Sequence, residues 1–96
     1  MFYVYILKCK DNSYYIGHTD NIEKRLAEHG DGKHHGYTST RLPVSLVFLQ
    51  EFQNRDEALE IERKLKKWSR NKKEALIKKN WQLVSEFSKK NFKNKE

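Results

Sequence analysis

The strongest constraint on the fold is a pair of β-branched and aromatic segments near the start of the chain, residues 2–9 and 14–18, separated by a short polar turn. This pattern predicts a β-hairpin. Side chains alternate between the two faces of a strand, and in residues 2–9 both faces are apolar. The two sets are Tyr3, Tyr5 and Leu7 on one face and Phe2, Val4 and Ile6 on the other. We therefore expect the first strand to be covered on both sides and to lie inside a sheet, not at its edge.

Helix starts are indicated by an aspartate or asparagine with a glutamate three residues later, the pattern of a capping box. The pattern occurs ahead of helices expected over 21–29, 55–69 and 72–79, as Asp20 with Glu23, Asn54 with Glu57 and Asn71 with Glu74. Gly30 is expected to end the first helix. Further helical turns over 81–87 and a frayed end from residue 88 complete the chain.

The segments between these helices are a loop and a strand. Residues 30–40 have no periodicity and predict a loop, while residues 44–52 predict a third strand. The element order β-β-α-β-α-α predicts an α+β fold, with a three-stranded, mostly antiparallel sheet flanked by helices.

The size of the chain limits it to one small domain with one site, because 96 residues bury only a modest core. No apolar run approaches the roughly 18 residues of a membrane span, and no basic segment precedes an apolar one as in a secretory signal. We therefore expect a cytoplasmic protein that does not associate with membranes. The single cysteine, Cys9, excludes a disulfide framework and a multi-cysteine zinc site. His18, His34 and His35 are then expected to be exposed loop residues or substrate contacts rather than zinc ligands.

Positive charge is concentrated in the last third of the chain. Residues 63–96 hold 13 Lys or Arg against 3 Asp or Glu, a net +10, whereas residues 1–62 have a net −3. This concentration of positive charge favours binding to a polyanion. Nucleic acid is the first candidate, and an anionic membrane surface is the second. A solvated lysine-rich surface without a partner is the alternative.

Two charged residues fall on apolar helical stripes. Arg25 lies near Ile22 on the first helix and needs an anionic partner, either a carboxylate or a bound phosphate. Glu62 lies near Ala58 on the second helix, where a carboxylate must be paired or bound to a metal. Lys66 projects into the same arc and is the alternative partner of Glu62.

Tyrosines crowd the predicted hairpin, and a glycine lies among them. Gly17 is two residues beyond Tyr15, so the two share a strand face. A glycine inside a strand often marks the close approach of a ligand or of another backbone.

The segment Tyr3-Val4-Tyr5, followed after nine residues by Tyr15-Ile16-Gly17, resembles the paired motif of the GIY-YIG nucleases. Arg25, His29 and Glu62 follow in the order that the family shows. Where the family name has its first glycine, this chain has a tyrosine.

This resemblance covers about residues 1–78 and leaves 79–96 as a basic C-terminal helix or tail. It is strongest with the small stand-alone bacterial members, the YhbQ-like group. The shared stretches are Tyr37-Thr38, Arg41-Leu42-Pro43-Val44 and Lys67-Trp68-Ser69-Arg70.

The resemblance implies a GIY-YIG endonuclease fold and a phosphodiesterase that uses one divalent metal, Mg²⁺ or Mn²⁺. By this mapping Tyr5 activates a water as general base and Tyr15 orients the water or the phosphate. Arg25 neutralises the developing charge, and Glu62 holds the metal at the leaving oxygen. His29 assists Tyr5 or contacts the phosphate. Metal and arginine together supply the charge neutralisation that phosphoryl chemistry needs.

We therefore expect a metal-dependent nuclease in repair or nucleic-acid processing, with DNA favoured over RNA. The basic residues expected to contact nucleic acid are Lys66, Arg70, Lys72, Lys73, Lys78 and Lys79. The alternative is a nucleic-acid-binding module of the same fold with weak or no turnover. A third hypothesis, that residues 63–96 bind a protein or a membrane surface, is disfavoured because this segment lacks a long apolar face. The oligomeric state is left open.

Overall fold

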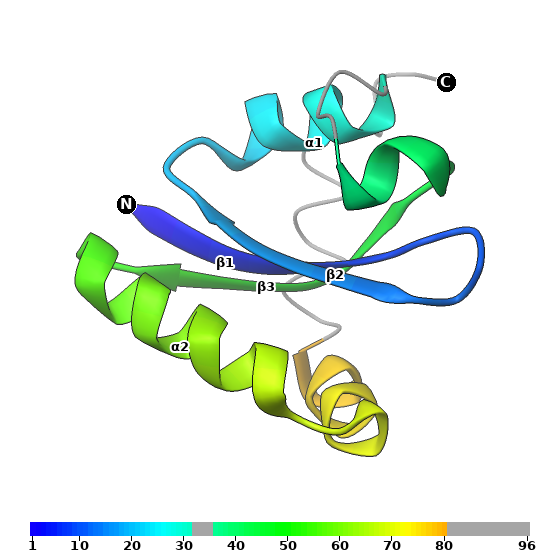
Figure 1. Ribbon diagram of the computed structural model, residues 1–96. Helices are drawn as coiled ribbons and strands as arrows, with labels where there is room; N and C mark the ends of the chain where they lie inside the picture. Colours follow the sequence, from blue (N-terminus) through cyan, green and yellow to red (C-terminus); the bar gives the residue numbers. More distant parts are fainter. Residues whose placement is uncertain (32–35, 81–96) are drawn as a thin grey trace.

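The computed structural model describes residues 1–31 and 36–80 and shows a sheet between two helical layers (Figure 1). The strands are β1 (Phe2–Lys8), β2 (Tyr14–Thr19) and β3 (Ser45–Phe52). The helices are α1 (Ile22–Gly30), the 3₁₀ helix η1 (Tyr37–Thr40), α2 (Arg55–Lys67) and the helical residues 70–80. The predicted α+β class and element order are confirmed, and η1 is an addition to them.

The first strand is the central strand of the sheet, as its two apolar faces predict. The strand order is β2-β1-β3, and β1 pairs antiparallel with both neighbours. A register shift between Ile6 and Leu7 makes a bulge against β3. Asn12 closes the β1–β2 turn with a positive φ of 68°, a conformation that asparagine tolerates well.

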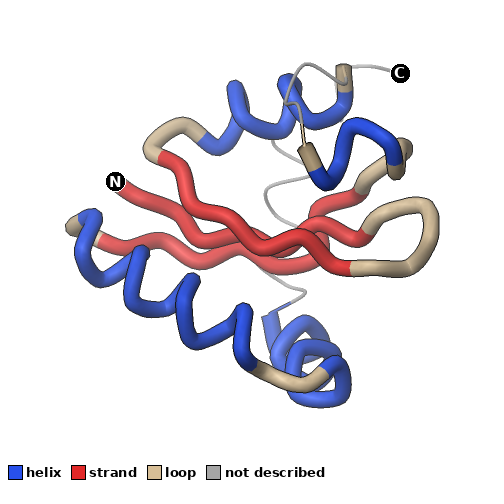
Figure 2. The backbone as a smooth tube through the Cα atoms, viewed as in Figure 1, coloured by secondary structure: helices blue, strands red, loops and turns tan. Residues whose placement is uncertain are grey.

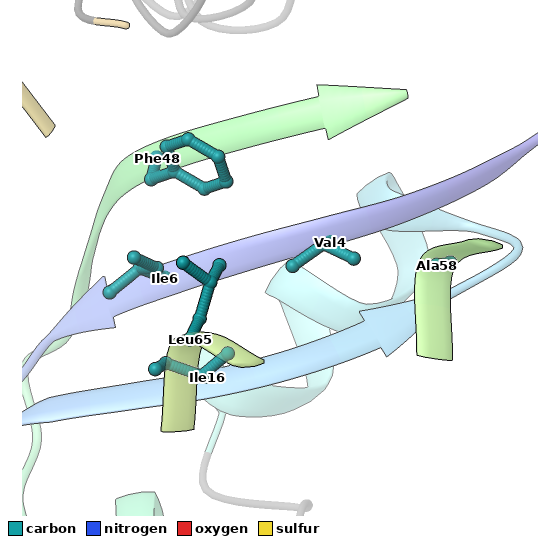
Figure 3. Packing of buried hydrophobic residues seen from close by; sticks show 6 residues of the cluster. All are labelled: Val4, Ile6, Ile16, Phe48, Ala58 and Leu65. Carbon is teal, nitrogen blue, oxygen red and sulfur yellow. The ribbon is translucent and has the colours of Figure 1, made fainter. Parts of the chain in front are cut away.

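The alternating side chains of β1 enter two separate cores. Val4 and Ile6 pack with Ile16, Phe48 and residues of α2 on one face (Figure 3). Tyr5 and Leu7 pack with Ile22 and Leu49 on the other face. α1 and η1 cover this second face, and α2 with residues 70–80 covers the first (Figures 1 and 2). None of the helices in the described part of the chain is long and apolar enough to cross a membrane.

Two of the three predicted helix caps are wrong by one or two residues. Asn21, not Asp20, caps α1, because its backbone is extended and its side chain accepts a hydrogen bond from the Lys24 amide. Ser69, not Asn71, caps the last described helix by accepting from the Lys72 amide. Asn54 caps α2 as predicted, at 2.9 Å from the Glu57 amide.

The helix ends also differ slightly from the prediction. Gly30 is the last residue of α1 and Asp31 follows it as the C-cap. α2 ends at Lys67, two residues before the predicted end, because Trp68 takes an extended conformation.

The predicted loop over 30–40 contains η1. Gly36 enters this short helix with a φ of 134°, which suits glycine, and the Ser39 hydroxyl donates to the Gly36 carbonyl. The segments 32–35, which hold His34 and His35, and 81–96 lie outside the described residues. The predictions for a last helical turn and for a frayed tail therefore stay predictions.

Gly17 is required because the Tyr5 ring lies across it. Tyr5 and Gly17 are direct partners in the β1–β2 ladder. A Cβ atom on Gly17 would lie 2.6 Å from Tyr5 Oη and 2.8 Å from Tyr5 Cζ. The group that approaches this glycine closely is therefore a side chain of the protein itself, where the sequence pattern predicted a ligand or a backbone.

The variant Gly17→Ala should lower the free energy of unfolding by about 1–3 kcal/mol, because the fully buried Tyr5 has no room to yield. Gly30→Ala is the matched control. A Cβ there meets nothing within 4 Å, and alanine is favoured in a helix by up to about 1 kcal/mol. Urea unfolding measures the free energy of unfolding of both variants and of the wild type. Equal stability of the two would contradict the packing of Tyr5 over Gly17.

Candidate active site

Three aromatic rings on the α1 side of the sheet form the centre of the candidate site. The ring centroids of Tyr5 and Tyr15 are 6.3 Å apart, and each lies close to the His29 ring, at 5.8 and 5.1 Å. Tyr5 extends from β1 across Gly17, Tyr15 stands beside Gly17 on β2, and His29 comes from the last turn of α1. Tyr5 and His29 are fully buried, whereas Tyr15 is only partly buried.

A hydrogen-bonded chain runs from Tyr5 through His29 to Thr38. Tyr5 Oη lies 3.1 Å from His29 Nε2, and His29 Nδ1 lies 2.7 Å from Thr38 Oγ1. A neutral imidazole donates from one nitrogen and accepts at the other, and a threonine hydroxyl can do either. Thr38 can therefore satisfy both tautomers of His29. The sequence singles out Thr38 only as part of the stretch Tyr37-Thr38 shared with the YhbQ-like group, and it predicts no role for the side chain.

Arg25 joins this cluster from α1. Its guanidinium is hydrogen-bonded to the Tyr5 hydroxyl and forms an ion pair with Glu28, with 3.3 Å between Nε and Oε1. Glu28 is therefore the carboxylate partner that an arginine on an apolar stripe requires. The Arg25 side chain is 31% exposed, so part of its donor fork also reaches solvent.

The environment of Tyr5 keeps its hydroxyl protonated. Burial raises the pKa of Tyr5 above its usual value, and the neighbouring Tyr15 raises it further. The hydrogen bond and positive charge of Arg25 lower the same pKa and offset part of that rise. At neutral pH Tyr5 is therefore a neutral phenol that can donate one proton and accept another.

Glu62 lies in the opposite helical layer. It is buried on α2, as its place on the apolar stripe predicts, with 8% of the residue exposed. Its Oε2 lies 2.9 Å from Lys66 Nζ and its Oε1 lies 2.5 Å from His18 Nδ1. Lys66, the alternative partner that the sequence offers, thus forms an ion pair with Glu62. The prediction for His18 as an exposed loop residue is wrong, because His18 lies on β2 and points towards α2.

The site residues that the family resemblance implies therefore do not all lie on one face of the sheet. Tyr5, Tyr15, Arg25 and His29 meet on the α1 side, whereas Glu62 approaches from the α2 side. β2 is an edge strand, and His18 follows Gly17 directly on it. The Glu62 charge is near enough to raise the Tyr5 pKa. The two halves of the site meet around the edge of β2.

Glu62 suits a divalent cation only as a single protein ligand. Within residues 1–31 and 36–80 there is no group of three or more His, Cys, Asp or Glu residues arranged to hold a metal. Mg²⁺ commonly takes one or two carboxylates and completes its shell with water and substrate phosphates. The Glu62 carboxylate fits that mode, provided that Lys66, whose side chain is mostly exposed, moves off Oε2.

The basic residues predicted to contact nucleic acid differ in their surroundings. Arg70 forms a surface ion pair with Glu74 at 3.1 Å and lies over the Tyr14 ring, so a neighbouring carboxylate already balances its charge. Lys72 lies 4.8 Å from the centre of the Trp68 ring. The other basic side chains on the helical residues 70–80, Lys73, Lys78 and Lys79, are exposed or partly exposed.

The family model described as the GIY-YIG catalytic domain matches residues 1–75. UPF0213 protein SH2523 of Staphylococcus haemolyticus is 49% identical over 75 residues, which cover 78% of this chain and 92% of that protein.

Two solution NMR structures are also similar to this chain. The UPF0213 protein BH0048 from Bacillus halodurans is 39% identical and has a TM-score of 0.59, covering 93% of this chain and 96% of that one. The protein EF2693 from E. faecalis is 40% identical and has a TM-score of 0.56, covering 80% and 82%.

The raised pKa of Tyr5 predicts a loss of stability at alkaline pH. The phenol ionises at about pH 10 in the unfolded chain and at higher pH in the folded protein. Its contribution is thus constant below about pH 10 and falls as pH rises towards the folded pKa. Urea unfolding at about pH 8, 10 and 11 should show the advantage of the wild type over Tyr5→Phe shrinking with pH. A pH-independent difference would contradict the burial of an ionisable Tyr5.

Proposed function

This chain belongs to the GIY-YIG family, and from that premise we propose that it is a metal-dependent nuclease that hydrolyses phosphodiester bonds. The family acts on nucleic acid; DNA as the preferred substrate and a role in repair or nucleic-acid processing are part of the proposal. The observation that carries it is the buried chain of hydrogen bonds from Tyr5 through His29 to Thr38, with Arg25 alongside.

The proposed proton path follows this chain. Tyr5 Oη takes a proton from the attacking water as it gives its own proton to His29 Nε2. His29 can accept there while its Nδ1 proton is held by Thr38 Oγ1 at 2.7 Å. The raised pKa keeps Tyr5 as the neutral phenol, and a neutral phenol is a weak base, so it can take the proton of the water only if it passes its own proton to His29 at the same time. Because Tyr5 is fully buried, substrate binding must shift a neighbouring side chain before water reaches its hydroxyl.

In this proposal Arg25 and Tyr15 contact the phosphate. Both are partly exposed and both border Tyr5. A guanidinium carries five N–H donors, of which the contacts with Glu28 and Tyr5 use only part. A preorganised donor of this kind stabilises charge that develops on the phosphate oxygens.

Glu62 would hold the divalent metal from the α2 side. When bound, Mg²⁺ or Mn²⁺ supplies positive charge that stabilises a developing oxyanion. His18 holds one carboxylate oxygen of Glu62, so the other oxygen, which now contacts Lys66, would be the one that binds the metal. A nucleic acid strand bound along the edge of β2 would then have Arg25 on one side and Glu62 on the other.

A binding module with little or no turnover is the second candidate. It is favoured by one observation, that both oxygens of Glu62 are already paired with cationic or potentially cationic groups. Hydrolysis requires the metal, whereas electrostatic binding falls with salt whether or not the metal is present.

Cleavage assays with labelled single-stranded, duplex and branched oligonucleotides test the proposal. The wild type should cut in Mg²⁺ or Mn²⁺ and not in chelator. Glu62→Ala should abolish cleavage and keep the fold, since His18 and Lys66 are partly exposed and regain water. Arg25→Ala should raise the barrier by about 2–4 kcal/mol.

Glu60→Ala is the matched control, because Glu60 lies on the same helix with a largely exposed side chain. It should cut like the wild type. A wild type that cuts nothing with either metal, or a Glu62→Ala protein that cuts at the normal rate, would refute the nuclease proposal. A thermal melt of each variant verifies its fold.

The lysines on the helical residues 70–80 should contribute to binding by neutralising phosphates. Replacing Lys72, Lys73, Lys78 and Lys79 with alanine should weaken binding and lower the salt slope by roughly 0.7–0.9 for each phosphate that is no longer neutralised. Anisotropy titrations over a range of salt concentrations measure this, with Lys10→Ala and Lys64→Ala as exposed controls on other elements. An unchanged slope would show that this surface is merely solvated.

A further inference from the structure

An open groove of about 270 Å³ crosses the outer edge of β2. Its lining residues are Tyr14, Tyr15, Ile16, Tyr37, Lys66 and Lys73. Tyr15 belongs to the α1 side of the sheet, with Tyr5 and His29. Lys66 belongs to the α2 side, where it pairs with Glu62. The groove therefore connects the two halves of the candidate active site.

Tyr37 in this groove is an aromatic residue held in place but left exposed. It is 41% exposed, whereas most large apolar side chains of the described residues are at least partly buried. The Arg41 guanidinium lies 3.8 Å from the centre of its ring. Arg41 itself is fixed by an ion pair with Asp11 at 3.1 Å and by donating to the Tyr37 carbonyl. The ring is thus ordered before any ligand binds, which lowers the entropy cost of binding.

The second ring of the groove is nearly parallel to the first. The Tyr15 and Tyr37 centroids are 6.3 Å apart, with an angle of 28° between the ring planes. The two stacked rings carry the aromatic character of the groove from the exposed Tyr37 to the Tyr5 cluster. Lys66 and Lys73, which also line the groove, add positive charge to it.

Aromatic faces beside lysines are typical of sites for single-stranded nucleic acid, where bases stack and phosphates meet cations. In a duplex the base faces are hidden by stacking with their neighbours. We propose that this groove binds one unpaired nucleobase on Tyr37, so that single-stranded or frayed nucleic acid is the substrate class of the site. The proposal rests on the proposed function, since it places the base next to the phosphate that the site would cleave.

Binding in chelator tests the groove without requiring cleavage. Fluorescence anisotropy compares a labelled oligo-dT, an oligo-rU and a blunt DNA duplex of equal length. Tyr37→Ala should weaken binding of oligo-dT, oligo-rU or both by about 5- to 100-fold and change duplex binding less than about twofold. Tyr37→Phe keeps the ring and should bind as the wild type does. Equal losses on single strand and duplex, or no loss on either single strand, would overturn the proposal.

An abasic strand separates stacking from charge. On an abasic oligonucleotide of the same length, Tyr37→Ala should bind as well as the wild type. Weaker binding there would show that Tyr37 acts on the backbone and would refute a base site. Lys73→Ala should weaken binding to both the abasic and the normal strand, with the exposed Lys64→Ala as its control.

Wild-type protein provides a measurement that needs no variant. In ¹³C-tyrosine-labelled protein, added oligo-dT should shift the ring-proton signals of Tyr37 upfield, because a stacked base shields them. Unchanged Tyr37 signals at saturation would contradict the proposal. Absence of cleavage in Mg²⁺ or Mn²⁺ together with these binding results would refute the nuclease and leave the base site standing.

Discussion

The contact between the Tyr5 ring and the bare backbone of Gly17 is the interaction on which the rest of the site depends. Only a residue without a Cβ can stand opposite Tyr5 in the β1–β2 ladder, since any Cβ would lie 2.6 Å from the Tyr5 oxygen. The ring therefore lies across β2, and its hydroxyl reaches His29 and Arg25. Because β1 is the central strand, covered on both sides, this geometry is built into the core and does not rely on a surface loop.

The two faces of β1 separate the site into two chemical halves. The α1 side carries the groups that move protons and meet the phosphate, and the α2 side carries the one buried carboxylate among the described residues. They meet where the sheet ends, at the outer edge of β2, through Glu62, His18 and Lys66. Lys66 contributes to both the ion pair and the groove, so displacing it from Glu62 would link the arrival of a strand to the arrival of a metal.

Much of this arrangement is predictable from local patterns, and the rest depends on contacts between distant residues. Apolar alternation predicts the central strand, and helical spacing predicts the burial of Glu62. The predicted cap of α1 is off by one residue because Asp20 and Asn21 are adjacent and cap equally well, and only the backbone conformation decides between them. His18 pairs with a residue 44 positions away, and Thr38 belongs to a turn too short to show periodicity. The sequence predicts that Arg70 contacts nucleic acid, and only the structure shows its ion pair with Glu74.

Paramagnetic relaxation tests most directly whether the two halves form one site. Mn²⁺ is titrated in substoichiometric steps into ¹⁵N-labelled protein bound to an oligonucleotide with non-hydrolysable linkages. The amide signals of Gly17, His18 and Glu62 should broaden first, and Glu62→Ala should abolish the effect. First broadening at acidic surface positions such as Asp11 or Asp56, with no change in Glu62→Ala, would contradict a metal site at Glu62.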